Sequence, residues 1–376
     1  MATLTCPPAL NAAMTNAEVD DVMVRGYVAI KAQDLRSAEE AFLSVVTQSP
    51  DSARAPEAML RLGHLQLHSD SVAALTTFTS LVEKRPESAE AVTAYYRIGS
   101  LNTRRHYYDD ARAAFIAVSE HKEASPMNKG RARLEASFVE LMKFFAKEYW
   151  GRSQDGSPQL VRSDALRIKI EHLETARKEF ESIRDDYAKS KYPELAAIAD
   201  CGIGEIYLLG EMPYLAERAY WRAIRQYGDM PDALITLART GLAQALYREG
   251  KAEKALEQYD LMLSNFTVGK VHGFEVAPKS LRPATMIWKA VALHDLGRMD
   301  EALAMAQQVK GELQSNNDAK SNQLMAEAEV WEGALLTNVG RTAEAIASLR
   351  DVIEKHPDTK EALRAQSLLS ELEGGN

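Results

Sequence analysis

The first residues to consider for metal binding are two histidines one helical turn apart. His64 and His68 are four positions apart, so a helix through both would place the two imidazoles on one face. Zinc proteases use this spacing, but they need a glutamate directly after the first histidine as the general base. Leu65 stands there, and no third ligand is evident nearby. We therefore expect no metal ion, and we interpret both histidines as solvent-facing or groove side chains.

The other candidate for chemistry is a cysteine. Cys201 lies between Asp200 and Gly202, and no histidine–aspartate arrangement that would activate a thiol is visible beside it. A partly buried structural thiol is the simpler interpretation. No Gly-x-Ser-x-Gly motif occurs, and Gly269-Lys270 lacks the flanking residues of a phosphate loop. The sequence thus predicts no enzyme and no cofactor, with an unrecognised active site in residues 127–190 as an alternative.

The composition indicates a helical protein and argues against two classes of partner. Of 376 residues, 46% are hydrophobic and 26% charged, while 20 glycines and 13 prolines are few for this length. Scarce helix breakers favour helix over strand. The net charge of −9 argues against nucleic-acid binding, which needs a basic surface, and equally against attachment to anionic lipid.

The N-terminus gives two expectations about compartment. It has no basic stretch followed by an apolar segment, and no apolar run has the length of a membrane span, so we expect a cytoplasmic protein without membrane insertion. Thr3-Leu4-Thr5-Cys6 is partly similar to a lipoprotein processing site, although the leucine lies one place late. A periplasmic or outer-membrane-associated protein whose export signal was removed is therefore the alternative.

One short pattern recurs along the chain: a small residue, eleven positions, an alanine, three positions, and a large apolar residue. It occurs at Gly26/Ala38/Phe42, Gly99/Ala111/Phe115, Gly204/Ala216/Tyr220, Ala243/Ala255/Tyr259 and Gly333/Ala345/Leu349, with a shorter copy at Gly63/Ala74/Phe78 and a weaker one at Ala290/Ala302/Ala306. Such a period indicates stacked helix pairs. We expect the small residue to face the alanine of its partner helix, and the large residue to fill the gap towards the next pair.

Turn signals separate the two helices of a pair. Gly210, Gly250, Gly297 and Gly340 follow the expected first helices, where a glycine serves as a left-handed cap. Pro50, Pro86 and Pro357 each lie eight residues after the large residue, where the second helix should end.

These features resemble the tetratricopeptide repeat family over roughly residues 18 to 357. The resemblance implies an all-α solenoid, a right-handed superhelix of antiparallel helix pairs. Ser49-Pro50-Asp51-Ser52-Ala53 and Arg85-Pro86-Glu87-Ser88-Ala89 are similar to repeats of bacterial envelope-assembly proteins.

The spacing divides the chain into five parts. We expect an N-terminal segment at 1–17, repeat arrays at 18–126 and 193–357, and a capping helix and tail at 358–376. Between the arrays, 127–192 should be a degenerate repeat with long helices and a polar inserted loop. A second insertion, 264–283, could form a hairpin or an ordered loop.

The resemblance also implies where a partner binds, since first helices line the concave surface in this family. The register places there Arg61, His64, Tyr96, Arg97, Arg104, Gln244, Arg248, Trp288, His294, Trp331 and Asn338. The family's carboxylate clamp needs a lysine and an asparagine where Met23 and Tyr27 stand, so that function is excluded for the N-terminal array.

The leading hypothesis is a non-enzymatic scaffold that binds a peptide or partner subunit in this groove. Arg61, Arg97 and Arg104 beside Tyr96 predict an acidic or aromatic-acidic partner segment. Alternatively, these arginines pair with local carboxylates such as Glu57. The alternative function is that of a bacterial cell-envelope assembly factor.

Overall fold

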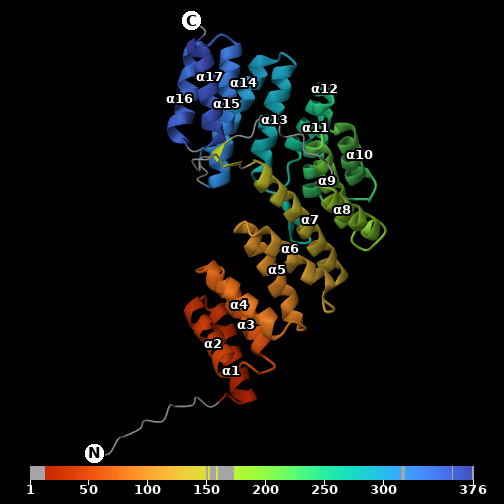
Figure 1. The fold of residues 1–376 in the computed structure, drawn as a ribbon, viewed down its shortest axis with the longest axis vertical. Coiled ribbons are helices and arrows are strands. Elements are labelled where there is room, and N and C mark those ends of the chain that lie inside the picture. Colours follow the sequence, from red (N-terminus) through yellow and green to blue (C-terminus); the bar gives the residue numbers. More distant parts are fainter. Residues whose placement is uncertain are drawn as a thin grey trace, which may run out of the picture. The chain divides into compact units, whose positions relative to one another are not determined.

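The computed structural model describes residues 13–149, 151–152, 158–159, 173–314, 318–357 and 359–374, which contain seventeen helices (Figure 1). The chain forms two compact units, residues 1–143 and 144–376. The boundary falls within a helix of the segment that the sequence assigns to the degenerate repeat, 127–192. Each unit consists of consecutive antiparallel helix pairs, which confirms the predicted solenoid class.

Unit 1 holds three helix pairs and most of one further helix. They are α1 (Asn16–Lys31), α2 (Leu35–Gln48), α3 (Ala55–Gln66), α4 (Ser71–Lys84), α5 (Ala89–Arg104), α6 (Tyr108–Glu120) and α7 (Pro126–Tyr149). α1 begins with a capping box, in which Thr15 and Glu18 bond each other's backbone amides. Asp70 and Ser88 cap α4 and α5 with their side-chain oxygens.

Unit 2 begins at Phe144, within α7. Its helices are α8 (Glu174–Tyr187), α9 (Pro193–Leu209), α10 (Pro213–Arg225), α11 (Asp232–Arg248), α12 (Ala252–Ser264), α13 (Leu281–Asp295), α14 (Met299–Leu313), α15 (Ala319–Asn338), α16 (Thr342–Lys355) and α17 (Lys360–Gly374). Two short strands, β1 (Gly151–Arg152) and β2 (Pro158–Gln159), pair antiparallel. The sequence predicts an exposed loop there, and residues 153–157 of this loop lie outside the residues that the structure describes.

Within each unit the core is a strip that passes from one pair to the next. Buried residues of α1, α2 and α3 form one cluster, those of α3 to α6 a second, and those of α5 to α7 a third. Two further clusters join α13 to α15 and α15 to α17. The marker alanines all have no exposed surface: Ala38, Ala74, Ala111, Ala216, Ala255, Ala302 and Ala345. No pair covers its apolar faces alone, so neighbouring pairs stabilise one another.

The glycines of the repeat pattern have a different partner from the expected one. A Cβ added to Gly26, Gly63 or Gly99 would lie 2.5 to 2.8 Å from the ring of Phe42, Phe78 or Phe115 in the same pair. Gly333 faces Leu349 in the same way. The glycine is therefore needed because the large residue of the second helix lies directly against it, whereas the sequence places that large residue in the gap towards the next pair.

Tyr220 shows the tightest case of this packing. Its ring lies against Gly204 of its own pair and against Gly241 of α11, the next first helix. Its hydroxyl donates to Glu205 Oε1 at 2.8 Å. The sequence pattern marks Gly204 but takes Ala243 as the small residue of α11, so it misses Gly241.

Six turns within pairs contain a left-handed residue, whereas the described turn between α3 and α4 contains none. Gly250, Gly297 and Gly340 have φ of 74–77°, as predicted. Gly210 does not, because its φ is −79° and the left-handed residue is Glu211 at φ 57°. Gln33 and His106 occupy the same place in the first and third pairs, with φ of 61° and 62°. The left-handed turn residue thus also occurs where glycine is absent, at a conformational cost of about 1 kcal/mol.

The second insertion forms a hairpin. β3 (Gly269–Val271) and β4 (Phe274–Ala277) pair antiparallel around His272 and Gly273, whose φ values of 49° and 80° fit a two-residue turn. The hairpin packs on α11, and His272 Nε2 lies 3.2 Å from Glu194 Oε2 of α9. It therefore braces the N-terminal ends of two first helices.

Among the described residues, no helix is both long and apolar enough to span a bilayer.

Candidate functional site

The first helices of unit 1 carry a ladder of aromatic rings and arginines. Tyr27, His64 and Tyr96 each lie edge-on against the large ring of their own pair, with centroids 5.2 to 5.6 Å apart. This packing fixes the three rings by the same Phe side chains that contact the glycines.

Each ring of this ladder is contacted by an arginine from the following first helix. Arg61 donates to the Tyr27 hydroxyl at 3.2 Å, and its guanidinium carbon lies 5.3 Å from the ring centroid. Arg97 donates to His64 Nε2 at 3.2 Å. Arg131 lies 4.1 Å above the Tyr96 ring. The contacts join residues 33 to 35 positions apart, so they exist only once the pairs stack.

The nearby carboxylates are engaged by other groups. Glu57 accepts from Arg54 at 2.5 Å and from the Tyr27 hydroxyl, and burial with this contact raises the pKa of Tyr27. Glu135 accepts from the Tyr96 hydroxyl, and burial raises the pKa of Glu135. Arg61 does not pair with Glu57.

Three predicted groove arginines therefore keep an uncompensated charge. Arg61, Arg97 and Arg104 are exposed, and none of them forms an ion pair with a carboxylate in the described part of the chain. Tyr96 is only partly accessible between Glu135 and Arg131.

His64 is held in its neutral form by these neighbours. Burial, Arg97 and Arg61 together lower its pKa, in that order of size.

α3 ends at Gln66, so His68 lies in the turn beyond it, and the prediction of one helix face for both histidines is wrong. Among the described residues, no group of three histidines, cysteines or carboxylates is placed to hold a metal ion.

Two predicted groove residues of unit 2, His294 and Asn338, belong to one chain of hydrogen-bonded side chains. The Tyr247 hydroxyl donates to Asp295, which also lies 2.9 Å from His294 Nδ1, and Asn338 Nδ2 lies 2.8 Å from His294 Nε2. This chain joins α11, α13 and α15, and burial and Asp295 raise the pKa of Tyr247 to about 12. Arg248 donates to the Leu208 carbonyl at 2.8 Å, so it caps the preceding first helix, α9.

The aromatic groove candidates of unit 2 are partly buried. Trp331 packs under Arg364 of α17, with the guanidinium 4.6 Å from the ring. Trp288 and Gln244 are also partly buried. Whether any of these residues binds a partner stays a prediction.

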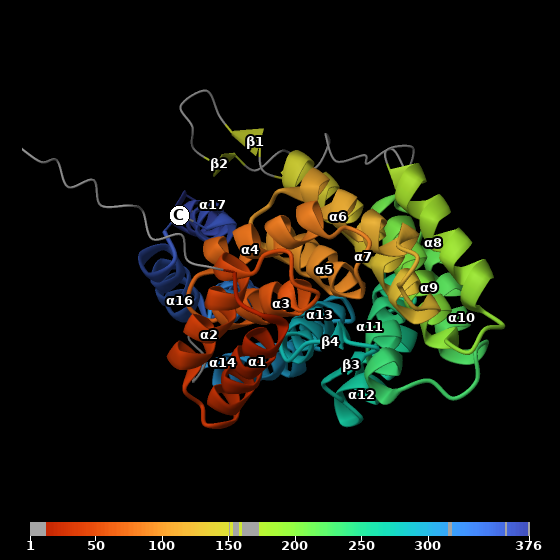
Figure 2. The ribbon, with the colours of Figure 1, turned by 90° about the horizontal axis from the view of Figure 1, so that it is seen from below.

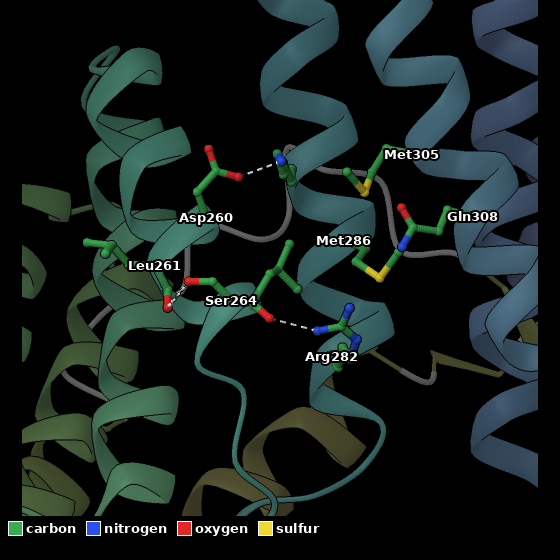
Figure 3. Close-up of a pocket in the computed structure, with 9 residues that line it drawn as sticks. Asp260, Leu261, Ser264, Arg282, Met286, Met305 and Gln308 are labelled. Atoms are coloured by element: carbon green, nitrogen blue, oxygen red, sulfur yellow. Dashed lines mark hydrogen bonds and ion pairs between the residues drawn. The ribbon is translucent and has the colours of Figure 1, made fainter.

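A cleft in unit 2 was not predicted from the sequence. It has a volume of about 490 Å³ and lies between α12, α13 and α14 (Figure 3). Met286 and Met305 contribute apolar surface. Arg282 bonds the Leu263 carbonyl at 2.9 Å, and Lys289 pairs with Asp260 at 2.6 Å. Its cations are thus already compensated, and the only signal for it in the sequence is the pair of methionines.

Cys201 is a structural thiol on α9. It is buried and forms no disulfide with any described residue. Its burial and the nearby charges of Asp200 and Glu205 raise the pKa of the thiol well above the usual range. A thiol that resists ionisation is a poor nucleophile. Cys6 lies outside the described residues.

The buried carboxylate beside Cys201 orders the second helix of the pair. Asp200 has no exposed surface and accepts from Arg222 at 2.6 Å and from the Tyr227 hydroxyl at 2.5 Å. This cluster, which sequence reasoning missed, fixes α10 on α9.

Comparisons with known proteins agree with this architecture. Residues 323–359 match the family model of the tetratricopeptide repeat. No curated protein matches the chain. A tetratricopeptide repeat protein from Parabacteroides merdae shares 14% identity at a TM-score of 0.53, over 83% of this chain and 99% of that one.

Two further solved structures are similar at lower scores. The Pseudomonas aeruginosa pilF structure has a TM-score of 0.44 and 13% identity, over 73% of this chain and 98% of that one. The structure of Rap protein complexed with competence and sporulation factor has a TM-score of 0.46 and 12% identity, over 96% of this chain and 99% of that one. Residues 323–359 thus match the tetratricopeptide-repeat family model, and the chain shares the helix-pair fold of a tetratricopeptide repeat protein.

Proposed function

We propose that the protein is a non-catalytic scaffold that holds an acidic segment of a partner protein against the ladder of unit 1. The tetratricopeptide-repeat fold supports a role in protein–protein interaction in general. The acidic chemistry of the partner rests on one observation: Arg61 and Arg97 contact aromatic rings and have no carboxylate partner among the described residues.

An arginine held by a ring is well suited to bind a carboxylate. Its side chain is already ordered, so less conformational entropy is lost on binding, and its planar N–H groups can bond a carboxylate in bidentate geometry. A hydrogen bond to a charged group contributes about 1.5–3 kcal/mol. Because the whole chain carries a net charge of −9, unpaired arginines are the places where an acidic segment is attracted.

The spacing of the two arginines suggests the form of the segment. They lie on α3 and α5, first helices of adjacent pairs that contact each other. Axes of packed helices lie about 8–10 Å apart. Three residues of extended chain span about 10 Å, so carboxylates three positions apart fit best.

Charge reversal tests the proposal. We expect Arg61→Glu/Arg97→Glu to weaken binding of a fluorescein-labelled octaglutamate peptide by about tenfold or more in fluorescence anisotropy, because two charged contacts are lost. Arg36→Glu/Arg85→Glu is the control for net charge, since it changes the charge equally at Arg36 of α2 and at Arg85, the C-cap residue of α4. Arg104→Glu, added to Arg97→Glu, shows whether the surface extends along α5.

Two outcomes would contradict the proposal. In the first, the ladder variant binds the peptide as tightly as the parent. In the second, circular dichroism shows that the variant has lost its fold, which would make the arginines structural and leave binding to other surfaces.

A further inference from the structure

The exposed face of α10 alternates aromatic and arginine side chains. Tyr214, Arg218, Trp221 and Arg225 follow one another at intervals of four, three and four residues, so they lie along one stripe of the helix. Arg222 lies beside them. These five residues are called the α10 stripe. Tyr214 is 61% exposed, and Arg218 and Arg225 are exposed as well.

The stripe contains two arginine–aromatic contacts, a close one and a more distant one. The guanidinium carbon of Arg225 lies 3.7 Å from the Trp221 ring centroid, and that of Arg218 lies 6.0 Å from the Tyr214 centroid. A guanidinium that lies flat on a ring keeps its N–H groups pointing outward in its own plane. Neither Arg218 nor Arg225 forms an ion pair with any residue that the structure describes.

The remaining arginine and the helix itself are firmly anchored. Arg222 pairs with the buried Asp200, so its charge is compensated and α10 is fixed on α9. Glu217, the one acidic residue of α10, pairs with Lys251 at 2.8 Å and does not neutralise the stripe. Arg218, Trp221, Arg222, Arg225 and Gln226 line a depression of about 350 Å³. A rigid helix therefore presents two free guanidiniums around an indole.

We infer that the α10 stripe is a second docking surface, which binds a short acidic segment of a partner protein through Arg218 and Arg225. Charge complementarity carries this inference, because two uncompensated arginines stand on a chain of net charge −9. Tryptophan, tyrosine and arginine are also the residue types that contribute most to protein interfaces. The surface lies on a second helix of a pair in unit 2, so it is separate from the proposed ladder site.

A short segment fits this surface better than a long polyanion. The stripe is one helix long, about 20 Å for thirteen residues. A nucleic acid or an anionic membrane extends well beyond it and meets the acidic remainder of the chain, which repels it. An acidic peptide touches the stripe alone. Arg218 and Arg225 are about 10 Å apart along the axis, which matches carboxylates three positions apart in an extended segment.

The test measures anisotropy of labelled octaglutamate with the full chain and with Arg218→Glu/Arg225→Glu. We expect the variant to bind about tenfold or more weakly, because two charged contacts are lost. Arg218→Lys/Arg225→Lys keeps the charge but loses the planar stack, so it should lose several-fold. Arg36→Glu/Arg85→Glu controls for net charge, and Arg61→Glu/Arg97→Glu separates this surface from the ladder.

The outcomes separate the two proposals. A loss in the α10 variant supports the stripe, whatever the ladder variant does. An unchanged affinity in the α10 variant overturns the stripe, and a loss confined to the ladder variant then supports only the ladder. Absence of any octaglutamate binding to the parent also overturns it. So does stripe-dependent binding of a labelled single-stranded oligonucleotide or of phosphatidylserine vesicles that exceeds octaglutamate binding.

Discussion

Replacing Gly241 by alanine should destabilise unit 2, because the Tyr220 ring has no room to move away. An added Cβ would overlap the ring atoms Cζ and Cε1. On its other side the ring faces Gly204, whose own Cβ position lies 2.6 Å from Cζ, and its hydroxyl is bonded to Glu205. Neither translation nor rotation of the ring therefore relieves the overlap.

Two opposing terms set the size of the effect. Overpacking a filled core costs about 1–3 kcal/mol, and the enclosed ring places Gly241→Ala near the upper end. Alanine is a better helix former than glycine by about 1 kcal/mol, which offsets part of the loss. We expect the free energy of unfolding to fall by about 2 kcal/mol.

The assay is urea unfolding followed by far-UV circular dichroism, with hydrogen exchange of α9 to α11 amides to localise the effect. Gly311→Ala in α14 is the matched control, because its added Cβ meets no atom within 4 Å and only the helix-propensity gain applies. Tyr220→Leu should reduce the cost of Gly241→Ala in a double-mutant cycle. Equal or higher stability of Gly241→Ala would refute the assignment of Tyr220 as the obstacle.

Three further expectations follow from the same packing. Tyr259→Phe should raise stability by about 1 kcal/mol in thermal unfolding, because the buried Tyr259 hydroxyl has no hydrogen-bond partner among the described residues. Tyr220→Phe should instead lower stability, because the Tyr220 hydroxyl donates a hydrogen bond to Glu205. Ala255→Leu should cost about 1–3 kcal/mol in the same assay, since the site has no free volume, and a parent-like melting curve would contradict this register. The lowered pKa of His64 means that the unfolded chain takes up its proton at a higher pH than the folded one, so stability should fall as the pH drops below neutral. In NMR titration the His64 midpoint should rise in Arg97→Ala, and an unchanged midpoint would exclude the arginine as a cause.

The repeat architecture was predictable because its signals are local. A glycine, an alanine and a large residue at fixed spacing lie within one pair, and one pair is what a period reveals. The helix ends before Pro50, Pro86 and Pro357 follow from proline alone, and α2, α4 and α16 do end two residues before them. The left-handed turn residue was predictable only where it is glycine. At Glu211 we attribute the left-handed φ to the packing of α9 on α10. Glutamate does not favour this conformation, so the sequence does not predict it.

The sequence predicts which arginines belong to the candidate site, but it does not predict whether they pair with carboxylates. The register names Arg61 and Arg97, yet it cannot show that Glu57 is taken by Arg54 and Tyr27. The Arg54 contact is local, but the Tyr27 contact joins adjacent pairs and lies about one repeat apart in sequence. The α10 stripe has a readable helical pattern, but the family resemblance directs attention to first helices and away from it.

The two arginine surfaces should differ in how binding affects stability. Arg61 and Arg97 rest on Tyr27 and His64, whose rings pack on the phenylalanines of the core, so a ligand there stabilises contacts between pairs. The Trp221–Arg225 stack belongs to one helix, and no ion pair joins its arginine to a neighbouring pair among the described residues. A ligand on the ladder is therefore linked to repeat stacking and should slow hydrogen exchange across α1, α3 and α5, whereas a ligand on the stripe should act only on α10. The position of the protected amides thus identifies which surface is occupied, independently of affinity.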